Sequence, residues 1–196
     1  IFETVRQSGS DIAAAARLLI DRANANGGED NITVVLIRIE DDLPIVIEPG
    51  RSIVGPAGVL LGRVIDLKPR NAISDFAVLD AGMTELMRPA LYGAFHRIEP
   101  LRASGAEPRH YELVGPVCES SDVVGRDRML PPLAIGDVVA IRDAGAYGSA
   151  MASNYNRRPL PAEVMVDDGH WHVIRRRQSI DDMLALEFGG KGAAVR

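Results

Sequence analysis

The sequence has 196 residues, of which 46% are hydrophobic and 25% charged, with a formal net charge of −5. This composition is typical of a globular protein with room for one domain of ordinary size and a smaller element beside it. The acidic balance argues against general binding to nucleic-acid phosphates. No apolar run approaches the roughly 20 residues of a membrane helix, so we expect no membrane partner and a cytoplasmic location. The single cysteine excludes an internal disulfide and a cysteine-based metal cluster.

Residues 11–25 predict a helix, because they are rich in alanine and leucine and their apolar positions recur at helical spacing. Ser10 or Asp11 would cap its start, and Gly27–Gly28 would end it. Residues 32–39 (ITVVLIRI) predict a strand, because β-branched residues are dense there. The start of this run is apolar at nearly every position, which is typical of a strand buried on both faces.

A charged pair and a proline follow this helix and strand, so we predict two domains, residues 1–42 and residues 43–196. In the second domain, short apolar runs alternate with glycine, proline and aspartate turns. This pattern predicts a mainly β (α+β) fold with an antiparallel β sandwich or barrel. Residues 167–170 (DDGH) predict a hairpin turn, and residues 179–187 a helix capped by Ser179. The predicted strands lie within residues 45–48, 58–67, 75–82, 111–117, 136–145, 162–168 and 170–177.

Residues 48–52 (EPGRS) place a carboxylate, a turn and a guanidinium at the end of an apolar strand. Glu48 can accept a hydrogen bond from a protonated ring nitrogen, and Gly50 lets backbone N–H groups approach a ligand closely. Arg51 can contact a phosphate or a carboxylate through two parallel hydrogen bonds. The alternative interpretation is a surface turn with an ion pair.

Two further motifs are compatible with ligand binding. Arg88 and Tyr92 are four residues apart, so they would share one face if their segment is helical, with Pro89 in the first turn. The alternative is an arginine stacked on a tyrosine at the surface. Small residues on both sides of Tyr147 leave room for a planar ligand against its ring, and the alternative is a close-packed turn. Asn154 nearby is expected to hold a loop.

The third motif is GPVCESSD, residues 115–122, in which Cys118 is followed directly by Glu119. A free cysteine is usually a small buried hydrophobe, but the polar neighbours weaken that interpretation here. A thiol can donate a proton near neutral pH, and the adjacent carboxylate could hold an ammonium group. Zinc is not predicted, because the four histidines lack ligand spacing with the cysteine. For a Cys–His hydrolase, the sequence pairs no histidine with Cys118.

Taken in order, EPGRS, DAGM…RPALY, GPVCESSD and DAGAYG…SNYN.RP resemble the C-terminal part of the diaminopimelate decarboxylases. This group also holds the ornithine and arginine decarboxylases, and the resemblance covers roughly residues 43–187. It implies the β domain of the fold-type III pyridoxal-phosphate decarboxylases. It also implies decarboxylation of meso-2,6-diaminopimelate to L-lysine, a step of lysine biosynthesis, with pyridoxal 5′-phosphate as cofactor.

The resemblance implies a role for each motif residue. Glu48 would face the pyridine nitrogen of the cofactor, Cys118 would donate the proton that replaces CO2, and Glu119 would recognise the distal amino group of the substrate. In relatives, the last two residues reach across a dimer interface, so a homodimer with shared sites is implied. A glutamate after the cysteine favours diaminopimelate over ornithine. The implied cofactor-binding residues are Glu48, Pro49, Gly50, Arg51 and Tyr147, and the implied substrate-binding residues are Arg51, Arg88, Tyr92, Glu119 and Tyr147.

The sequence departs from the family where the cofactor is attached. The family's cofactor-binding lysine and glycine-rich phosphate loop belong to an N-terminal barrel without a counterpart in this sequence. Lys68 and Lys191 fall in a strand end and a tail, so we expect this chain alone to be inactive. Because the chain begins at Ile1, we expect a piece of a longer protein. The alternative function is a non-catalytic β module kept for interaction or dimer formation.

Residues 1–40 resemble the closing helix and strand of the metal-dependent serine/threonine phosphatases of the PP2C type. In that family the aspartate before asparagine, here Asp30, is a ligand for Mg2+ or Mn2+. The other metal carboxylates of that family lie in motifs without a counterpart here, and one carboxylate cannot hold such an ion. We therefore expect no metal site and an inert Asp30. A chain joined from two unrelated pieces would account for both resemblances, and a phosphatase fragment with a passenger domain is the third interpretation.

Overall fold

The computed structural model describes residues 6–8, 11–25, 50–102 and 105–188, and the chain divides into two compact units, Ile1–Pro49 and Gly50–Arg196. In the first unit, α2 covers Ile12–Ala25. The side chain of Asp11 accepts a hydrogen bond from the backbone N–H of Ala14 at 2.9 Å, so the predicted cap is confirmed. The predicted strands 32–39 and 45–48, together with Asp30, Glu48, Pro49 and Lys191, lie outside the described residues.

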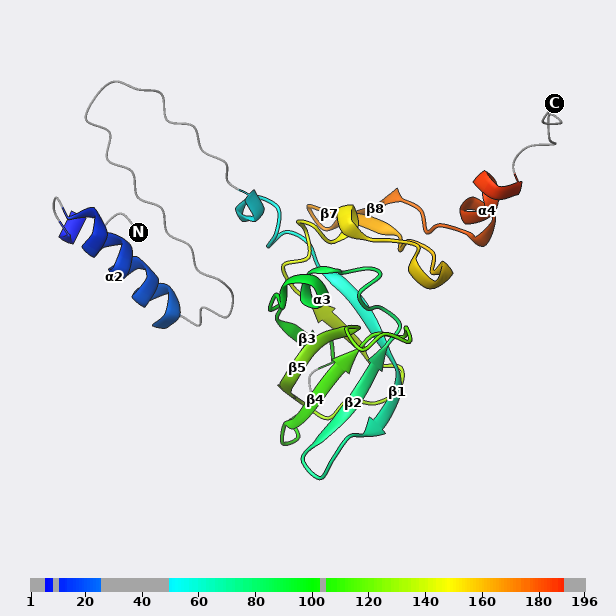
Figure 1. Ribbon diagram of the computed structural model, residues 1–196, viewed down its shortest axis with the longest axis horizontal. Coiled ribbons are helices and arrows are strands. Elements are labelled where there is room, and N and C mark those ends of the chain that lie inside the picture. Colours follow the sequence, from blue (N-terminus) through cyan, green and yellow to red (C-terminus); the bar gives the residue numbers. More distant parts are fainter. Residues whose placement is uncertain (1–5, 9–10, 26–49, 103–104, 189–196) are drawn as a thin grey trace, which may run out of the picture. The chain divides into compact units, whose positions relative to one another are not determined.

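The second unit is built on a six-stranded sheet in the order β3–β6–β1–β2–β4–β5 (Figure 1). Its two end strands, β3 and β5, lie against each other, so the sheet forms a nearly closed barrel and confirms the predicted fold class. Adjacent strands are antiparallel apart from β2 and β4, which run parallel and are joined by a long connection through α3 and β3. The elements are β1 Leu60–Pro69, β2 Ser74–Leu79, α3 Arg88–Tyr92, β3 Ile98–Pro100, β4 Arg109–Val114, β5 Val123–Leu130 and β6 Val138–Ile141.

Two of these strands are not predicted from the sequence. β5 carries Arg126, Asp127 and Arg128 in its middle, which interrupts the apolar alternation. Asp127 has a positive φ of 49°, and the register between β4 and β5 shifts, as in a β-bulge. β3 is only three residues long and ends at Pro100. Both strands form because they pair with segments distant in the sequence, and the local residue pattern does not predict such pairing.

The barrel interior is filled by side chains from every strand of the sheet. Tyr111, on β4, is almost fully buried, and its hydroxyl accepts a hydrogen bond from the backbone N–H of Leu133 at 3.0 Å. This bond satisfies two buried polar groups at once. The core cluster comprises Val64, Ala77, Leu79, Leu86, Ile98, Tyr111, Leu113, Val124, Leu130, Leu133, Val139 and Ile141.

The strands β7 (Glu163–Asp167) and β8 (His170–Arg175) form a separate two-stranded ribbon, and the turn between them confirms the predicted hairpin. Its two turn residues both have positive φ, 44° and 76°, which matches the right-handed twist of a hairpin. Directly opposed residues share a face of the ribbon. One face therefore carries four apolar side chains, all exposed within the described chain, from the pairs Val164–Val173 and Val166–Trp171.

The last element, α4 (Ile180–Phe188), begins with the predicted cap. The Ser179 hydroxyl accepts from the backbone N–H of Asp182 at 3.1 Å, and the Asp182 carboxylate accepts from the backbone N–H of Ser179 at 2.8 Å. This reciprocal pair is a capping box with aspartate in the glutamate position. The hydrogen bond from Arg176, together with those from Ser179, lowers the pKa of Asp182. No helix in the described ranges is both long and apolar enough to cross a membrane.

We expect Leu113→Ala to lower the free energy of unfolding by about 2–5 kcal/mol, because it leaves a cavity in the barrel core. Urea denaturation followed by circular dichroism measures the change. Ile135→Ala is the matched control, because that side chain is 66% exposed, and its effect should stay within about 0.5 kcal/mol. Equal losses in the two variants would contradict the assignment of the barrel interior as the core.

Candidate functional site

The turn that carries Arg51 packs against the turn that precedes Tyr147. Arg51 lies in the short 3-10 helix Gly50–Ser52, and its carbonyl accepts from the N–H of Gly55. The carbonyl of Gly55 in turn accepts from the N–H of Gly145 at 3.0 Å. A Cβ on Gly58 would lie 2.2 Å from the Cα of Gly145, so only glycine allows the two backbones to approach this closely.

Tyr147 presents its ring to solvent from a strained backbone. Its side chain is 50% exposed and its φ is 61°, the left-handed region that non-glycine residues rarely adopt. Asp143, at the start of the same turn, has a φ of 58°. Such residues persist only where the surrounding structure holds them, and they cluster at functional sites. The segment joins the exposed Tyr147 to the turn that carries the half-buried Arg51.

Arg88 begins α3 and is buried, so the predicted helix is confirmed, with Pro89 in its first turn. Its Nη1 donates to Nε2 of His96 at 3.2 Å, and Nδ1 of His96 donates to the carbonyl of Arg142 at 2.8 Å. Because a guanidinium can only donate, these partners assign the proton of the neutral imidazole to Nδ1.

Arg88 and Tyr92 are four residues apart on the α-helix α3, as their predicted common face requires, but they differ in burial, because Arg88 is buried and Tyr92 is 63% exposed. The helix has five residues and ends at Gly93, which has a left-handed φ of 63°. Its first residue therefore reaches the interior, while its last lies at the exposed end. The alternative of an arginine stacked on Tyr92 at the surface is wrong, because Arg88 is buried.

His96 is held neutral between charged neighbours. It is 1% exposed, and burial lowers its pKa below the ordinary value of 6.5. The hydrogen bond to the carbonyl of Arg142 and the charge of Asp143 oppose this shift, while the positive charges of Arg88 and Arg51 add to it. The imidazole thus lies within the electrostatic reach of both arginines that the sequence places in a ligand site.

Cys118 and Glu119 lie on an exposed loop between β4 and β5. The alternative of a buried cysteine is therefore wrong. Glu119 Oε2 accepts a hydrogen bond from the hydroxyl of Tyr155 at 3.3 Å, and Tyr155 belongs to the SNYN segment. Asn154 in the same segment donates to the carbonyl of Arg158 at 2.8 Å, so its predicted role in holding a loop is confirmed.

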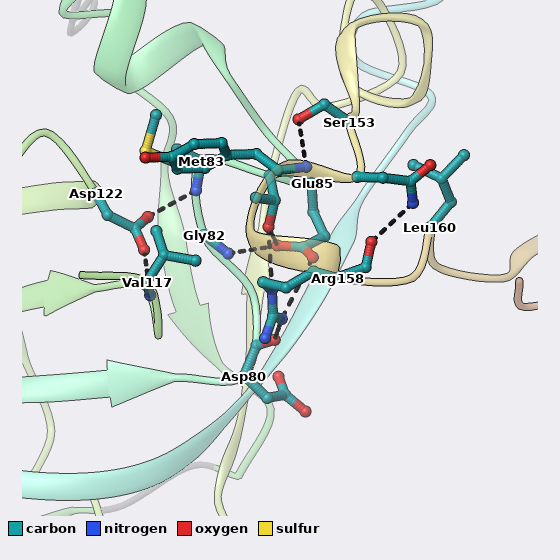
Figure 2. A network of polar contacts seen from close by, with 12 residues as sticks. Asp80, Gly82, Met83, Glu85, Val117, Asp122, Ser153, Arg158 and Leu160 are labelled. Atoms are coloured by element: carbon teal, nitrogen blue, oxygen red, sulfur yellow. Dashed lines mark hydrogen bonds and ion pairs between the residues drawn. The ribbon is translucent and has the colours of Figure 1, made fainter. Parts of the chain in front are cut away.

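The loop is anchored by the polar contacts of Asp122 that Figure 2 shows. This residue is 2% exposed. Its two carboxylate oxygens accept from the backbone N–H groups of Met83, at 2.7 Å, and Val117, at 3.0 Å. Met83 belongs to the turn Asp80–Met83 that follows β2. One buried carboxylate thus joins two motifs, DAGM and GPVCESSD, that lie far apart in the sequence.

A second buried carboxylate holds the same turn from its other side (Figure 2). Glu85 Oε2 accepts from the N–H of Gly82 at 2.8 Å, and Glu85 Oε1 lies 3.3 Å from Nη2 of Arg158. Arg158 also donates to the carbonyl of Asp80 at 2.5 Å and to the hydroxyl of Thr84 at 3.1 Å. The SNYN.RP segment is fixed to the DAGM turn by these bonds.

Among the described residues, no group of three or more histidine, cysteine, aspartate or glutamate side chains could hold a metal ion. Lys68 lies on β1, and its Nζ is 3.2 Å from the carboxylate of Asp66. The structure gives the predicted site residues two sets of contacts. Arg88 bonds to His96, and the turns of Arg51 and Tyr147 meet at the glycine contact. Glu119 bonds to Tyr155, and the loop that carries it and Cys118 bonds to the DAGM turn.

Comparisons of this chain with a family model, with known sequences and with solved structures all point to one protein family. The family model described as pyridoxal-dependent decarboxylase, C-terminal sheet domain, matches residues 18–145. The diaminopimelate decarboxylase of Pseudomonas aeruginosa is 51% identical over 146 residues, which cover 74% of this chain and 35% of that protein. The enzyme of the same name from Vibrio cholerae is 49% identical, with 74% and 34% covered. The chain spans about a third of the length of these relatives.

A solved structure agrees with these relatives. The crystal structure of diaminopimelate decarboxylase from Helicobacter pylori complexed with L-lysine superposes with a TM-score of 0.68 at 45% identity, covering 74% of this chain and 36% of that one.

The described residues fit part of a pyridoxal-phosphate site. Arg51 offers a guanidinium and Tyr147 an exposed ring on adjoining turns, and the glycine contact at Gly145 leaves no side chain between the two backbones. These groups suit a planar ligand that carries a phosphate. Covalent attachment requires a lysine, and the described part of the chain offers Lys68, which is paired with Asp66 on the barrel. The fit is therefore to the non-covalent half of such a site.

Four residues that sequence analysis did not assign to the site position the predicted ones: His96, Asp122, Glu85 and Arg158. Nothing in the sequence distinguishes His96 from the other three histidines or pairs it with Arg88. For Asp122, the available signal is its position at the end of a loop that has glycine at its start, since a carboxylate can pack against a glycine Cα. Their roles follow from contacts between distant segments.

We expect stability to fall as the pH drops below about 6.5, the ordinary pKa of histidine, because unfolding lets His96 take up a proton that burial opposes. The unfolded state then binds more protons than the folded state, so this contribution to stability is present above that pH and is lost below it. At pH 5.5 the loss reaches at most about 1.4 kcal/mol. Urea denaturation at pH 7.5 and pH 5.5 measures it. His96→Gln should reduce the difference between the two pH values, and an unchanged difference would assign the pH dependence to other groups.

Proposed function

Because the chain belongs to the pyridoxal-dependent decarboxylases and contains their C-terminal sheet domain, we propose that it supplies the sheet-domain part of a diaminopimelate decarboxylase site. The reaction is the decarboxylation of meso-2,6-diaminopimelate to L-lysine and CO2. The relatives that carry this name are 44–51% identical to the chain. The L-lysine bound to the Helicobacter pylori enzyme is the product of that reaction, which supports diaminopimelate as the substrate.

The single observation that carries the proposal is the contact between the Arg51 turn and the Tyr147 turn at Gly58 and Gly145. Arg51 and Tyr147 are far apart in sequence. Their turns meet at Gly58 and Gly145, where the backbones are too close for any side chain larger than hydrogen. A guanidinium and an exposed aromatic ring on adjoining turns suit the phosphate and the ring of one ligand. Pyridoxal phosphate, when bound, supplies the electron sink that decarboxylation requires.

We assign Cys118 the role of proton donor. In the reaction, the bond between the substrate carbon and its carboxylate breaks, CO2 leaves, and a proton takes its place on the carbon. The thiol of Cys118 provides this proton and becomes a thiolate, which takes up a proton from water before the next turnover. Its exposure at the tip of the loop leaves the sulfur accessible to a substrate.

Glu119 is assigned to the distal ammonium group of diaminopimelate. A carboxylate that accepts hydrogen bonds from an ammonium forms a charge-assisted contact of high specificity. The hydroxyl of Tyr155 donates to Glu119 Oε2 at 3.3 Å and leaves Oε1 available to a substrate. Arg51 and Arg88 are assigned to the carboxylates of the substrate, with Tyr92 and Tyr147 beside them.

We further propose that the active form is a homodimer in which the exposed Cys118–Glu119 loop serves the site of the partner subunit. The exposure of residues 118–121 supports this arrangement, because an exposed loop is accessible to a second subunit. The alternative is a non-catalytic dimerisation module, which the uncovered apolar face of the β7–β8 ribbon favours. Dimer formation without any binding of pyridoxal phosphate would support the alternative.

For residues 1–42 we propose an origin in the C-terminal end of a phosphatase of the PP2C type, without metal binding at Asp30. The family model of the decarboxylases starts at residue 18, inside α2, so the two assignments overlap there. Calorimetry with Mn2+ tests the proposal, and uptake of one ion that Asp30→Asn abolishes would overturn the inert role of Asp30.

The catalytic assignment predicts a large loss of turnover in Cys118→Ser. A chimera supplies the missing part of the site: residues 50–188 of this chain replace the matching segment of the Pseudomonas aeruginosa relative. We expect the chimera to release CO2 from diaminopimelate, and Cys118→Ser to lower kcat by about 100-fold or more, because a hydroxyl is a far weaker acid than a thiol.

Ser120→Ala, two residues along the same exposed loop, is the matched control for this experiment and should leave kcat within about twofold. An inactive chimera that is folded and binds pyridoxal phosphate would argue against the proposed function. An active chimera that tolerates Cys118→Ser would retain the function and refute the role of the cysteine.

Glu119→Gln in the same chimera should raise KM for diaminopimelate by about tenfold or more, because it removes the charge from a hydrogen bond to an ammonium group. Tyr155→Phe should raise KM less, since Tyr155 only orients the carboxylate. Initial rates at several substrate concentrations separate KM from kcat. Equal KM values for the chimera and its Glu119→Gln variant would remove Glu119 from substrate recognition.

A further inference from the structure

The loop that carries Cys118 and Glu119 cannot be positioned by the packing of its own tip. Residues 118–121 are all exposed, and the next residue, Asp122, is 2% exposed. An exposed tip has few apolar contacts to order it, so its geometry depends on hydrogen bonds at its base. The backbone that carries the thiol and the carboxylate is therefore positioned where the loop leaves and re-enters the barrel, while the Tyr155 hydroxyl orients the Glu119 carboxylate at the tip.

Asp122 closes the base of this loop with four hydrogen bonds. Its carboxylate accepts from the N–H of Val117 at 3.0 Å, inside the loop, and from the N–H of Met83 at 2.7 Å, outside it. Its backbone N–H donates to the carbonyl of Glu119 at 3.0 Å, and its carbonyl accepts from the N–H of Gly115 at 2.9 Å. The residues on either side of the cysteine are thus bonded to the same aspartate.

The carboxylate fits this position without spare room. A Cβ on Gly115 would lie 2.2 Å from both carboxylate oxygens of Asp122, and a Cβ on Gly82 would lie 2.3 Å from one of them. Both glycine backbones therefore press against the carboxylate. A longer acid would collide with them, and an amide could accept only one of the two backbone N–H groups while its own N–H2 faced the other.

The outer partner of Asp122 is itself rigidly held. The neighbour of Met83, Gly82, donates to buried Glu85, and Glu85 pairs with Arg158 (Figure 2). The turn is thus bonded on both sides to buried or half-buried charged groups. The hydrogen bond from Met83 to Asp122 therefore fixes the base of the loop relative to this turn.

We propose that Asp122 is the positioning residue of the 115–122 loop and holds the Cys118 thiol and the Glu119 carboxylate in place relative to the Gly82–Met83 turn. The part that concerns proton donation rests on the proposed function. The part that concerns the loop does not, because it follows from contacts within this chain.

The single cysteine allows a direct test on the full chain without cofactor or substrate. A nitroxide attached to Cys118 reports the nanosecond motion of the loop through its electron paramagnetic resonance line shape. We expect a restricted line shape in the labelled protein and a mobile one in its Asp122→Asn variant, with at least a threefold shorter rotational correlation time. Restriction that persists in a folded Asp122→Asn variant overturns the proposal.

Two controls separate positioning from a general loss of stability. Asp137→Asn removes a carboxylate that accepts from the N–H of Ala134 at 2.8 Å in a turn on another part of the barrel. Val139→Ala weakens the barrel core. Both should lower the melting temperature while the spectrum of the label stays restricted. Mobilisation by either control to the extent seen in Asp122→Asn would make the effect a general one and overturn the specific role of Asp122.

A measurement on the unsubstituted chain covers the case in which Asp122→Asn does not fold. Amide hydrogen exchange followed by nuclear magnetic resonance should show the N–H groups of Met83 and Val117 protected at least about tenfold more than those of Ser120 and Ser121. Exchange of all four at one rate overturns the proposal. Neither result depends on decarboxylase activity, so a failure here is distinct from a failure of the proposed function.

Discussion

Two buried carboxylates that hold neighbouring N–H groups of one turn organise most of the candidate site. Asp122 accepts from Met83 and Glu85 accepts from Gly82, so the DAGM turn is gripped from two sides. A buried carboxylate that lacks partners is strongly unfavourable, which makes the geometry of each one demanding. Here the backbone and Arg158 provide those partners. Three segments remote in sequence, the DAGM turn, the cysteine loop and the SNYN.RP segment, are thereby fixed to one another.

A second contact between distant segments depends on glycines, which have no side chain. The backbones at Gly58 and Gly145 approach so closely that a methyl group on either would overlap the other segment or its neighbours. This contact sets the distance between the turns of Arg51 and Tyr147, and the barrel beneath supplies the rigid support. The His96–Arg88 pair adds a buried polar contact, and the positive charges of Arg88 and Arg51 both lower the pKa of this imidazole. Charge and close packing thus act together to hold the turns of Arg51 and Tyr147 and the buried Arg88 in place.

The sequence predicts those parts of the fold that local pattern determines. The capped helix at Ile12–Ala25, the barrel strands with strong apolar alternation, the hairpin turn at 167–170 and the capping box at Ser179 all follow from residues close in sequence. β5 is not predicted, because charged residues interrupt the apolar pattern in its middle. The parallel pairing of β2 with β4 is not predicted either, because it depends on the path of the long connection between the two strands. For the site, the motifs identify the residues that face solvent, including Cys118 and Tyr147. They do not identify Asp122, His96, Glu85 or Arg158, because the role of each depends on a partner many residues away.

The ribbon of β7 and β8 has a practical consequence. Trp171, the only tryptophan in the sequence, lies on its uncovered apolar face beside Val166. Indole emission shifts to shorter wavelength when the ring leaves water, so this chain carries a built-in optical reporter of that face. When another polypeptide covers the ribbon, the fluorescence maximum of Trp171 will shift to shorter wavelength, so no added dye is needed to detect the event.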